Sequence, residues 1–274
     1  MVLSHAALQR ALVIALHDPG FVDAMHADAA GVLGPLGVTA EERAQLLAVD
    51  RRAFHTDPLR ARRVLRVLAE ELKISTTLAL WETRSAAFAD GFFASAFFRA
   101  AVAERTALAP AFGAYLAAAP LATPQLPDVV RLETLMARCR RAARSRARPG
   151  VGLAPGVGTA RFDAGVLETV RVVEGFLFEV GLMPQLAWCS DGPQLPALPA
   201  VGRGTVCLLL TPSESGVGIA EIDEDLHRVL AALEAPTADV ATTLAALGLP
   251  AAGVTGLLAS LAEEGLVTSA TPPA

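Results

Sequence analysis

Residues 244–267 have the sequence "LAALGLPAAGVTGLLASLAEEGLV", which predicts two helices joined by a tight turn. In the second helix, apolar residues recur at i, i+3, i+4 and i+7 and so share one face; they are Val254, Leu257, Leu258 and Leu261. Gly265 ends this helix, and residues 266–269, "LVTS", predict a closing strand. The stretch therefore predicts helix, turn, helix and strand in that order.

A β-hairpin is predicted immediately upstream of these helices. Residues 205–210, "TVCLLL", and residues 216–223, "GVGIAEID", are short apolar runs separated by the turn residues "TPSES". A helix is then predicted over residues 224–233, and another after Thr237, which we expect to be its N-cap. A hairpin with three helices is the arrangement of a winged helix, a fold that usually binds DNA.

The rest of the chain predicts helices and two Pro/Gly-rich interruptions. The chain has 274 residues, of which 53% are hydrophobic, so it is long enough to bury a core. Thr39 and Glu42 have the spacing of a capping box. We expect a helical domain over residues 1–148, a connecting segment over 149–200 and the winged helix over 201–274. The predicted fold class is mainly α, with a small α+β C-terminal domain.

The predicted winged helix lacks the charges that DNA binding requires. Residues 229–274 contain no Lys or Arg, and their acidic residues are Glu234, Asp239, Glu263 and Glu264. DNA affinity depends on neutralising phosphates with cations, and base recognition in the major groove uses Arg, Lys, Asn or Gln. The last helix offers only Thr255 and Ser260 as neutral polar side chains. We therefore expect that this module does not read DNA.

An arginine cluster in residues 131–148 is the strongest electrostatic feature of a chain whose net charge is −5. It contains Arg131, Arg138, Arg140, Arg141, Arg144, Arg146 and Arg148, against the single acid Glu133. Three interpretations of the cluster compete. It is a solvated helix end whose cations suit the helix dipole, or a surface that binds an acidic partner, or a contact for nucleic acid. The first interpretation needs no partner. The last makes a DNA-binding transcriptional regulator the alternative function.

Two hypotheses remain for a winged helix without cations. The simpler hypothesis is that it is a packing domain with no ligand, and the functional hypothesis is that it binds a peptide. An exposed strand beside an apolar helix can accept an extended peptide as an extra strand. The expected docking edge is the strand over residues 217–222 together with the helix over 253–261. The candidate leader-binding residues are Val217, Ile219, Glu221, Ile222, Gly253, Thr255, Gly256 and Ser260.

No catalytic or metal-binding constellation is predicted. The five histidines are scattered, and Cys139, Cys189 and Cys207 do not have the spacing of metal ligands. The Gly-rich stretch over residues 149–158 lacks the residues of a nucleotide-binding loop. We expect no signal peptide and no membrane span, and therefore a cytoplasmic protein.

Two stretches of the chain resemble known families. Residues 203–267, from "RGTVCLLLTPSESGVGIAEID" to "LAEEGLV", resemble the recognition element of the enzymes that modify ribosomally made peptides (the RiPP recognition element). That element is a peptide-binding winged helix. Residues 92–120, "FFASAFFRAAVAERTALAPAFGAYLAAAP", and 126–138, "LPDVVRLETLMAR", are similar to the accessory partners of multinuclear non-haem iron oxidative enzymes. The methanobactin-cassette accessory subunit belongs to that group, and the second resemblance covers roughly residues 40–148.

These resemblances imply a noncatalytic subunit that forms a heterodimer with an iron enzyme and captures the leader of a precursor peptide. The iron belongs to the partner, and this chain is expected to bind no cofactor, no nucleic acid and no membrane. The expected contact with the enzyme includes Phe92, Phe93, Arg131 and Arg138, and an internal core is the equally open alternative for the phenylalanines. A helical oxygenase subunit with no peptide role is the remaining alternative.

Overall fold

The computed structural model describes most of the chain. The described residues are 5–57, 59–144, 151–180, 195–200, 204–214, 216–235, 239–248 and 251–268. The expectations for Arg146, Arg148, Thr237 and Cys189 fall outside these ranges. The chain is mainly helical with a small α+β portion near its C-terminus, which confirms the predicted fold class.

The chain forms two compact units whose boundaries differ from the predicted domains. Unit 1 contains Met1–Val130 and Val172–Pro196, and unit 2 contains Arg131–Arg171 and Ala197–Ala274. Residues 149–200 are therefore not simply a connecting segment, because they supply strands to unit 2 and a helix that continues into unit 1.

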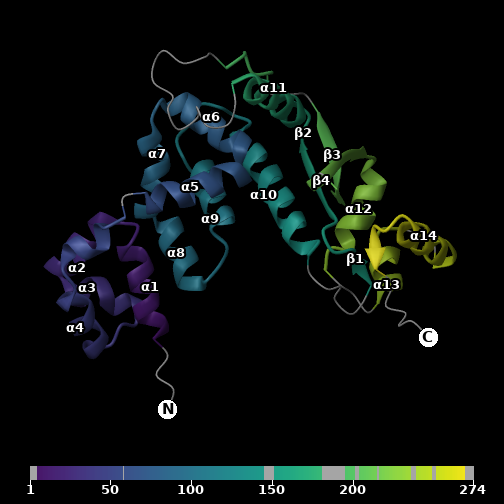
Figure 1. The fold of residues 1–274 in the computed structure, drawn as a ribbon. Helices are drawn as coiled ribbons and strands as arrows, with labels where there is room; N and C mark the ends of the chain where they lie inside the picture. Colours follow the sequence, from purple (N-terminus) through teal and green to yellow (C-terminus); the bar gives the residue numbers. More distant parts are fainter. Residues whose placement is uncertain are drawn as a thin grey trace. The chain divides into compact units, whose positions relative to one another are not determined.

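Unit 1 is entirely helical in the described residues (Figure 1). Its helices are α1 (Ala6–Ala15), α2 (Pro19–Ala27), α3 (Ala29–Leu33), η1 (Gly34–Leu36), α4 (Ala40–Ala48), η2 (Arg51–His55), α5 (Arg60–Glu71), α6 (Lys73–Thr83), α7 (Ala86–Asp90), η3 (Gly91–Ala94), α8 (Ala96–Glu104) and α9 (Leu108–Ala117). The start of α10 (Leu126–Ala142) and the end of α11 (Gly165–Val180) also belong to it.

The predicted capping box begins α4. The backbone N–H of Thr39 donates to Glu42 Oε2 at 3.0 Å, and the N–H of Glu42 donates to Thr39 Oγ1 at 3.2 Å. The two hydrogen bonds satisfy backbone donors that have no partner inside the helix. The hydrogen bond from Thr39 is also the main reason that the pKa of the Glu42 carboxyl is lowered.

An aromatic cluster forms the centre of unit 1. The ring centroid of Phe92 lies 5.5 Å from Phe98, 5.1 Å from Phe112 and 5.7 Å from Tyr115. The Tyr115 hydroxyl donates to the carbonyl oxygen of Phe88 at 2.6 Å, which satisfies the polar end of the ring. Phe92 is 0% exposed and Phe93 2% exposed, so both are core residues.

Unit 2 is built on a three-stranded antiparallel sheet with the order β2-β3-β4. Its strands are β2 (Gly158–Asp163), β3 (Thr205–Ser213) and β4 (Gly216–Ile222). The β3–β4 hairpin confirms the predicted hairpin. The third strand is β2, and the predicted C-terminal strand β5 (Val267–Thr268) pairs instead with β1 (Gly152–Leu153). The sheet of the predicted winged helix is therefore completed from the segment that we expected to be a connector.

A helix covers each face of this sheet (Figure 1). We call the face covered by α10 the α10 face and the face covered by α12 the α12 face. On the α10 face, the Arg131 guanidinium lies 4.3 Å from the ring centroid of Phe162. On the α12 face, Arg161 forms an ion pair with Glu224, the first residue of α12 (Glu224–Ala232). Because neighbouring residues of a strand point to opposite faces, the central strand β3 is buried on both sides over residues 207–210.

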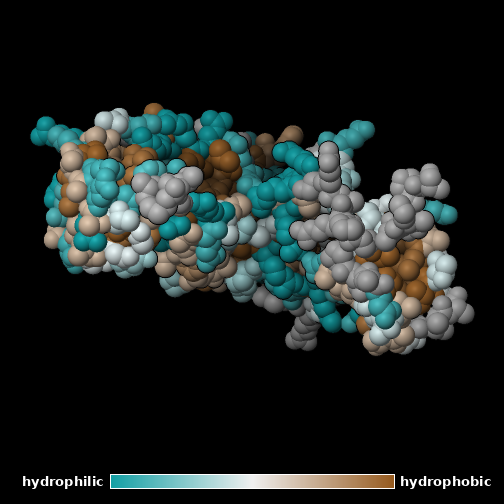
Figure 2. Space-filling view, turned by 90° about the horizontal axis from the view of Figure 1, so that it is seen from below, coloured by the Kyte–Doolittle hydropathy of each residue, from teal (hydrophilic) through white to brown (hydrophobic). Residues whose placement is uncertain are grey.

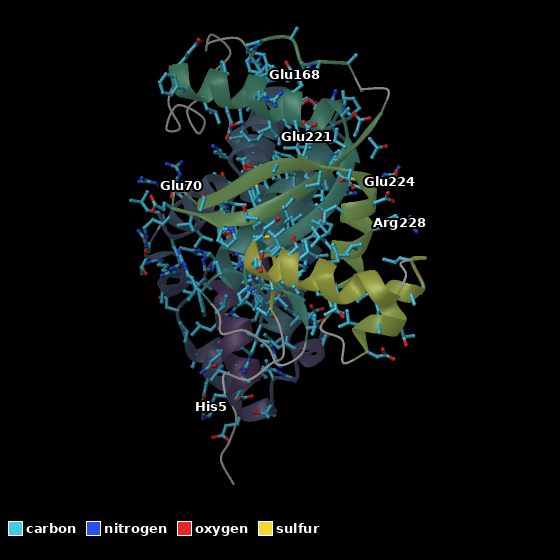
Figure 3. The ribbon with its side chains drawn as sticks, turned by 90° about the vertical axis from the view of Figure 1, so that its right-hand side faces the viewer. His5, Glu70, Glu168, Glu221, Glu224 and Arg228 are labelled. Carbon is cyan, nitrogen blue, oxygen red and sulfur yellow. The ribbon has the colours of Figure 1, made fainter. Side chains whose placement is uncertain are left out.

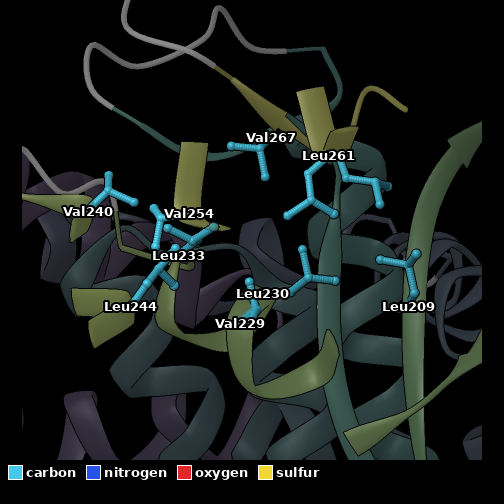
Figure 4. Packing of buried hydrophobic residues seen from close by; sticks show 10 residues of the cluster. Leu209, Val229, Leu230, Leu233, Val240, Leu244, Val254, Leu261 and Val267 are labelled. Atoms are coloured by element: carbon cyan, nitrogen blue, oxygen red, sulfur yellow. The ribbon is translucent and has the colours of Figure 1, made fainter. Parts of the chain in front are cut away.

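A second hydrophobic cluster joins the C-terminal helices to the sheet (Figure 4). It contains Leu230 of α12, Leu244 of α13 (Val240–Ala245), Leu261 of α14 (Ala251–Glu263) and Leu209 of β3. The N-cap of α13 is Asp239, whose side chain accepts from the N–H of Thr242 at 3.0 Å, and not the predicted Thr237.

Because Phe92 lies in the core, its substitution is expected to change the free energy of unfolding much more than substitution of an exposed phenylalanine. Phe92→Ala is expected to lower the free energy of unfolding by about 3–5 kcal/mol, because it leaves a cavity in the aromatic cluster. The matched control Phe178→Ala is expected to change it by less than about 0.5 kcal/mol, since Phe178 is 93% exposed. Urea unfolding followed by circular dichroism measures both. Equal effects of the two substitutions would contradict the core placement.

Candidate functional site

The strand β4 has one unpaired edge. It pairs with β3 on one side, and no other strand pairs with it within the described ranges. Ile219, Ala220 and Glu221 are exposed, and Ile219 is 37% exposed. A free strand edge presents backbone N–H and C=O groups that can pair with another extended chain. The predicted docking edge is therefore an edge strand, as the peptide hypothesis requires.

The residues of β4 divide between the two faces of the sheet. Ile219 pairs with Leu210 and Glu221 with Leu208, which places both residues, and Val217 with them, on the α10 face. Ile222 pairs with Cys207, which places it on the α12 face. We expected Val217, Ile219, Glu221 and Ile222 to share one groove with the last helix. The register corrects this expectation, because only Ile222 of these four residues faces the C-terminal helices.

The α12 face of β4 is made of small residues that were not among the predicted site residues. Gly218 pairs with Thr211 and Ala220 with Leu209, and they precede Ile222 on this face. The space above Gly218 is partly filled by Thr211, whose Oγ1 would lie 3.3 Å from a Cβ atom added there, whereas Ala220 is exposed. Alternation along the hairpin was a sufficient signal for finding them, since Gly218, Ala220 and Ile222 are two residues apart.

Helix α14 presents the low-profile surface that the sequence predicts. Gly253, Thr255, Gly256 and Ser260 are exposed, whereas Val254 and Leu261 are buried. Figure 2 shows a hydrophobic surface over α13 and α14, at the right of the view. A Cβ atom added to Gly256 would have no heavy atom within 4 Å, so the space beside this residue is open.

Strand β4 and helix α14 meet through the hydrophobic cluster rather than by direct packing. Helix α14 packs on α13 and β5, and α12 is the helix that packs on β2 and β3. Ile222 of β4 and Leu257 and Leu258 of α14 are partly buried against the same cluster. Ile222 thus lies against the same cluster as α14, whereas Val217, Ile219 and Glu221 lie on the opposite face of the sheet.

Acidic side chains surround the end of β4. Figure 3 shows Glu221 on β4 and Glu224 and Arg228 on α12. Glu224 lies 3.1 Å from Arg161, and Asp225 lies 3.6 Å from Arg228. The N-cap Asp223 accepts a hydrogen bond from Leu226 at 2.7 Å. The surface here is therefore acidic to neutral and does not suit a phosphate backbone.

Several arginines of the cluster in residues 131–148 have partners inside unit 2. Arg138 lies 2.7 Å from Glu234, and Arg131 donates to the carbonyl oxygen of Arg161. Arg140 and Arg141 also have interaction partners. The contacts of Arg131 and Arg138 connect α10 to the rest of unit 2, a role that none of the three interpretations of the cluster included.

The residues predicted to contact a partner enzyme fall into two groups. Arg131 and Arg138 are exposed and stay candidates for such a contact. The prediction is wrong for Phe92 and Phe93, because side chains inside the aromatic core cannot form a docking surface. The aromatic run has helical spacing, and that pattern is the same for a core face and for an exposed one.

A polar contact links α12 to the sheet and was not predicted. The Thr159 hydroxyl of β2 donates to the carbonyl oxygen of Leu208 at 3.0 Å and lies 2.8 Å from His227 Nδ1. Thr159 is buried, and its hydroxyl on β2 contacts one group of β3 and one group of α12. No local sequence signal indicates it, because the three residues come from distant segments.

The described cysteines are buried thiols. Burial raises the pKa of Cys139 and of Cys207. Within the parts of the chain that the structure describes, no three or more His, Cys, Asp or Glu side chains gather as a metal site would require. None of the helices in these ranges is both long enough and apolar enough to cross a membrane.

Comparison of the chain with models of protein families gives no match, and comparison with curated proteins gives none either.

Alanine substitutions at two glycines test the packing of β2 against α10 and the exposure of α14. Gly158→Ala is expected to lower the free energy of unfolding by about 1–3 kcal/mol, since its Cβ would lie 2.8 Å from Cys139 Sγ and 3.2 Å from Leu135 Cδ1. Gly256→Ala is expected to raise it by up to about 1 kcal/mol, because alanine favours a helix and the space is open. Thermal unfolding of both variants checks the difference. Destabilisation by Gly256→Ala would place α14 against a neighbour instead of solvent.

Proposed function

We propose that this chain is a noncatalytic subunit that captures the leader of a ribosomally made precursor peptide. The leader adds to β4 as a further strand of the unit 2 sheet. The observation that carries the proposal is the unpaired edge of β4, with exposed residues along it. Backbone hydrogen bonds to such an edge supply affinity, and pockets for alternate side chains supply specificity.

Both faces of β4 would contact side chains of the leader. Leader side chains on the α10 face would contact Val217 and Ile219, both of which are at least partly exposed. Side chains on the α12 face would lie beside Ala220, which is exposed. The exposed surface of α14 is then a secondary contact for the part of the leader that extends past Ile222.

The partner enzyme in the proposal is a multinuclear non-haem iron oxidative enzyme, and it holds the iron. This part rests on the resemblance of residues 92–138 to accessory subunits of such enzymes. Because Phe92 and Phe93 are core residues, the enzyme would contact other apolar side chains of unit 1. Among the described residues, the exposed large ones are Leu12, Val13, Leu47, Val49, Leu59, Val67 and Phe178. The heterodimer is proposed to act in the cytoplasm.

A DNA-binding regulator is the alternative, and the charges favour the peptide. Such a regulator would use the arginines of residues 131–148, because residues 229–274 carry no Lys or Arg. Arg131 and Arg138 already have partners within unit 2. Phosphate binding at these two arginines would have to displace these contacts, whereas strand addition at β4 displaces none among the described residues.

Where a short precursor gene is found beside the gene for this chain, fluorescence polarisation with its labelled synthetic leader tests the proposal. Ile219→Asp is expected to weaken binding by about tenfold, because it places a charge on the apolar strip of β4. The matched control Val67→Asp changes an exposed valine of α5, which is 60% exposed, and is expected to leave binding unchanged.

Two results would contradict the proposal. One is binding of duplex DNA with a steep salt dependence and no binding of the leader. The other is equal leader affinity of Ile219→Asp and the control. Point substitutions are preferable to deleting residues 201–274, because that deletion would remove β3, the pairing partner of β2.

A further inference from the structure

A pocket of about 340 Å³ lies within unit 1, between the end of α1, the start of α2, η2 and the start of α5. Its walls are formed by Leu16, His17, Pro19, Phe54, His55, Asp57 and Ala61. Phe54 is 2% exposed, whereas Pro19 and His55 are exposed, so the pocket has a buried floor and an open rim. Ligand pockets usually have volumes of roughly 300–1,000 Å³, and this one is at the lower end of that range. It is large enough for one aromatic ring.

Contacts between its walls hold the pocket in shape. Arg60 donates to the carbonyl oxygen of Leu16 at 3.3 Å, which connects the start of α5 to the end of α1. The ring centroid of His17 lies 5.1 Å from that of Phe93 and 5.7 Å from that of Phe98. The aromatic core of unit 1 therefore fixes the imidazole that forms one wall, and the pocket is formed before a ligand arrives.

Two of the polar walls offer hydrogen-bond acceptors. His17 Nδ1 lies 3.0 Å from the carbonyl oxygen of Val13. A carbonyl oxygen only accepts, so Nδ1 carries the proton in this contact, and Nε2 of the neutral ring is an acceptor. The Asp57 carboxylate is also an acceptor. A ligand that satisfies these groups must therefore supply an O–H or N–H donor.

The charges at the pocket favour a neutral ligand. The hydrogen bond from Arg63 is the main reason that the pKa of the Asp57 carboxyl is lowered, so this group is ionised near pH 7. An anion would be repelled by the carboxylate. A cation would gain little, because Arg63 already forms an ion pair with Asp57. The remaining walls, Leu16, Pro19, Phe54 and Ala61, are apolar.

Exposed apolar side chains continue the surface along α1. Leu12 and Val13 are each 39% exposed and lie one helical turn before Leu16 and His17. An apolar surface that extends past a pocket is typical of a contact with another protein, in which one anchoring side chain fills the pocket. The surroundings of this pocket thus suit a side chain of a partner protein.

We propose that this pocket receives a tyrosine or tryptophan side chain of the protein that docks on unit 1. The ring would lie against Leu16 and Phe54, and its O–H or N–H would donate to His17 Nε2 or to Asp57. Tyrosine and tryptophan combine a large apolar ring with one polar donor, and they are enriched among the residues that contribute most to binding at interfaces. This inference rests on the proposed function and names the kind of residue with which the partner enzyme is anchored.

Amide NMR spectra of the isotope-labelled full chain, titrated with small probes, test the pocket without the partner. The probes are N-acetyltyrosinamide, N-acetylphenylalaninamide and p-cresol. N-acetyltyrosinamide is expected to shift the amide signals of residues 16–18 and 54–61. It is expected to bind about threefold to tenfold more tightly than N-acetylphenylalaninamide, because only its ring carries a donor.

Filling the pocket with a side chain of this protein is expected to abolish binding of the probe. Ala61 is a half-buried wall residue, and Ala61→Phe places a ring in the space. Ala61→Leu makes a smaller change of the same kind and is used if Ala61→Phe lowers the thermal stability. The control Ala44→Phe adds the same ring at an exposed position of α4 and is expected to leave probe binding unchanged.

Three results would overturn the pocket assignment. They are the absence of shifts at these residues with every probe, equal affinity for the tyrosine and phenylalanine probes, and binding of p-cresol without binding of N-acetyltyrosinamide. The last result would indicate a site for a free small molecule.

Failure of leader capture is measured separately, because β4 belongs to unit 2 and the pocket to unit 1. Ala61→Phe is expected to keep the leader affinity of the wild type. A wild type that binds the tyrosine probe but no leader would contradict leader capture and leave the pocket assignment standing.

Discussion

The pairing of β3 with a strand on each side determines the form of unit 2. Leu208, Leu209 and Leu210 are buried on the two faces of this central strand, so the sheet needs a helix on each face. Helix α10 covers one face and α12 the other. With β2 on one side of β3, the hairpin partner β4 is left at the edge. The candidate peptide site is thus a consequence of how the core of the sheet is buried.

Local patterns in the sequence predicted local structure well. The alternation and turn residues of 205–223 predicted the β3–β4 hairpin, and the spacing of Thr39 and Glu42 predicted the capping box. The helical periodicity of residues 253–261 predicted which residues of α14 are exposed and which are buried. In each of these places the signal lies within one short continuous stretch, and the local structure needs no distant segment to complete it.

Features that join distant segments were not predictable in this way. Strand β2 is six residues long and pairs with β3 across the whole of α11, so nothing in its own sequence identifies its partner. Burial of Phe92 depends on rings from α8 and α9, and helical spacing cannot distinguish that core from a docking face. The prediction of one groove formed by β4 and α14 was wrong, because the strand register decides which face of the sheet each residue of β4 lies on.

Hydrogen exchange of the full chain with and without the synthetic leader is the sharpest test of strand addition at β4. The leader is predicted to slow exchange of the free-edge backbone amides of β4, residues 216–222, because they gain partners in the added strand. Exchange in the opposite edge strand β2, residues 158–163, is predicted to stay the same. Leader binding that leaves β4 exchange unchanged, or that protects β2 in its place, would contradict strand addition at β4.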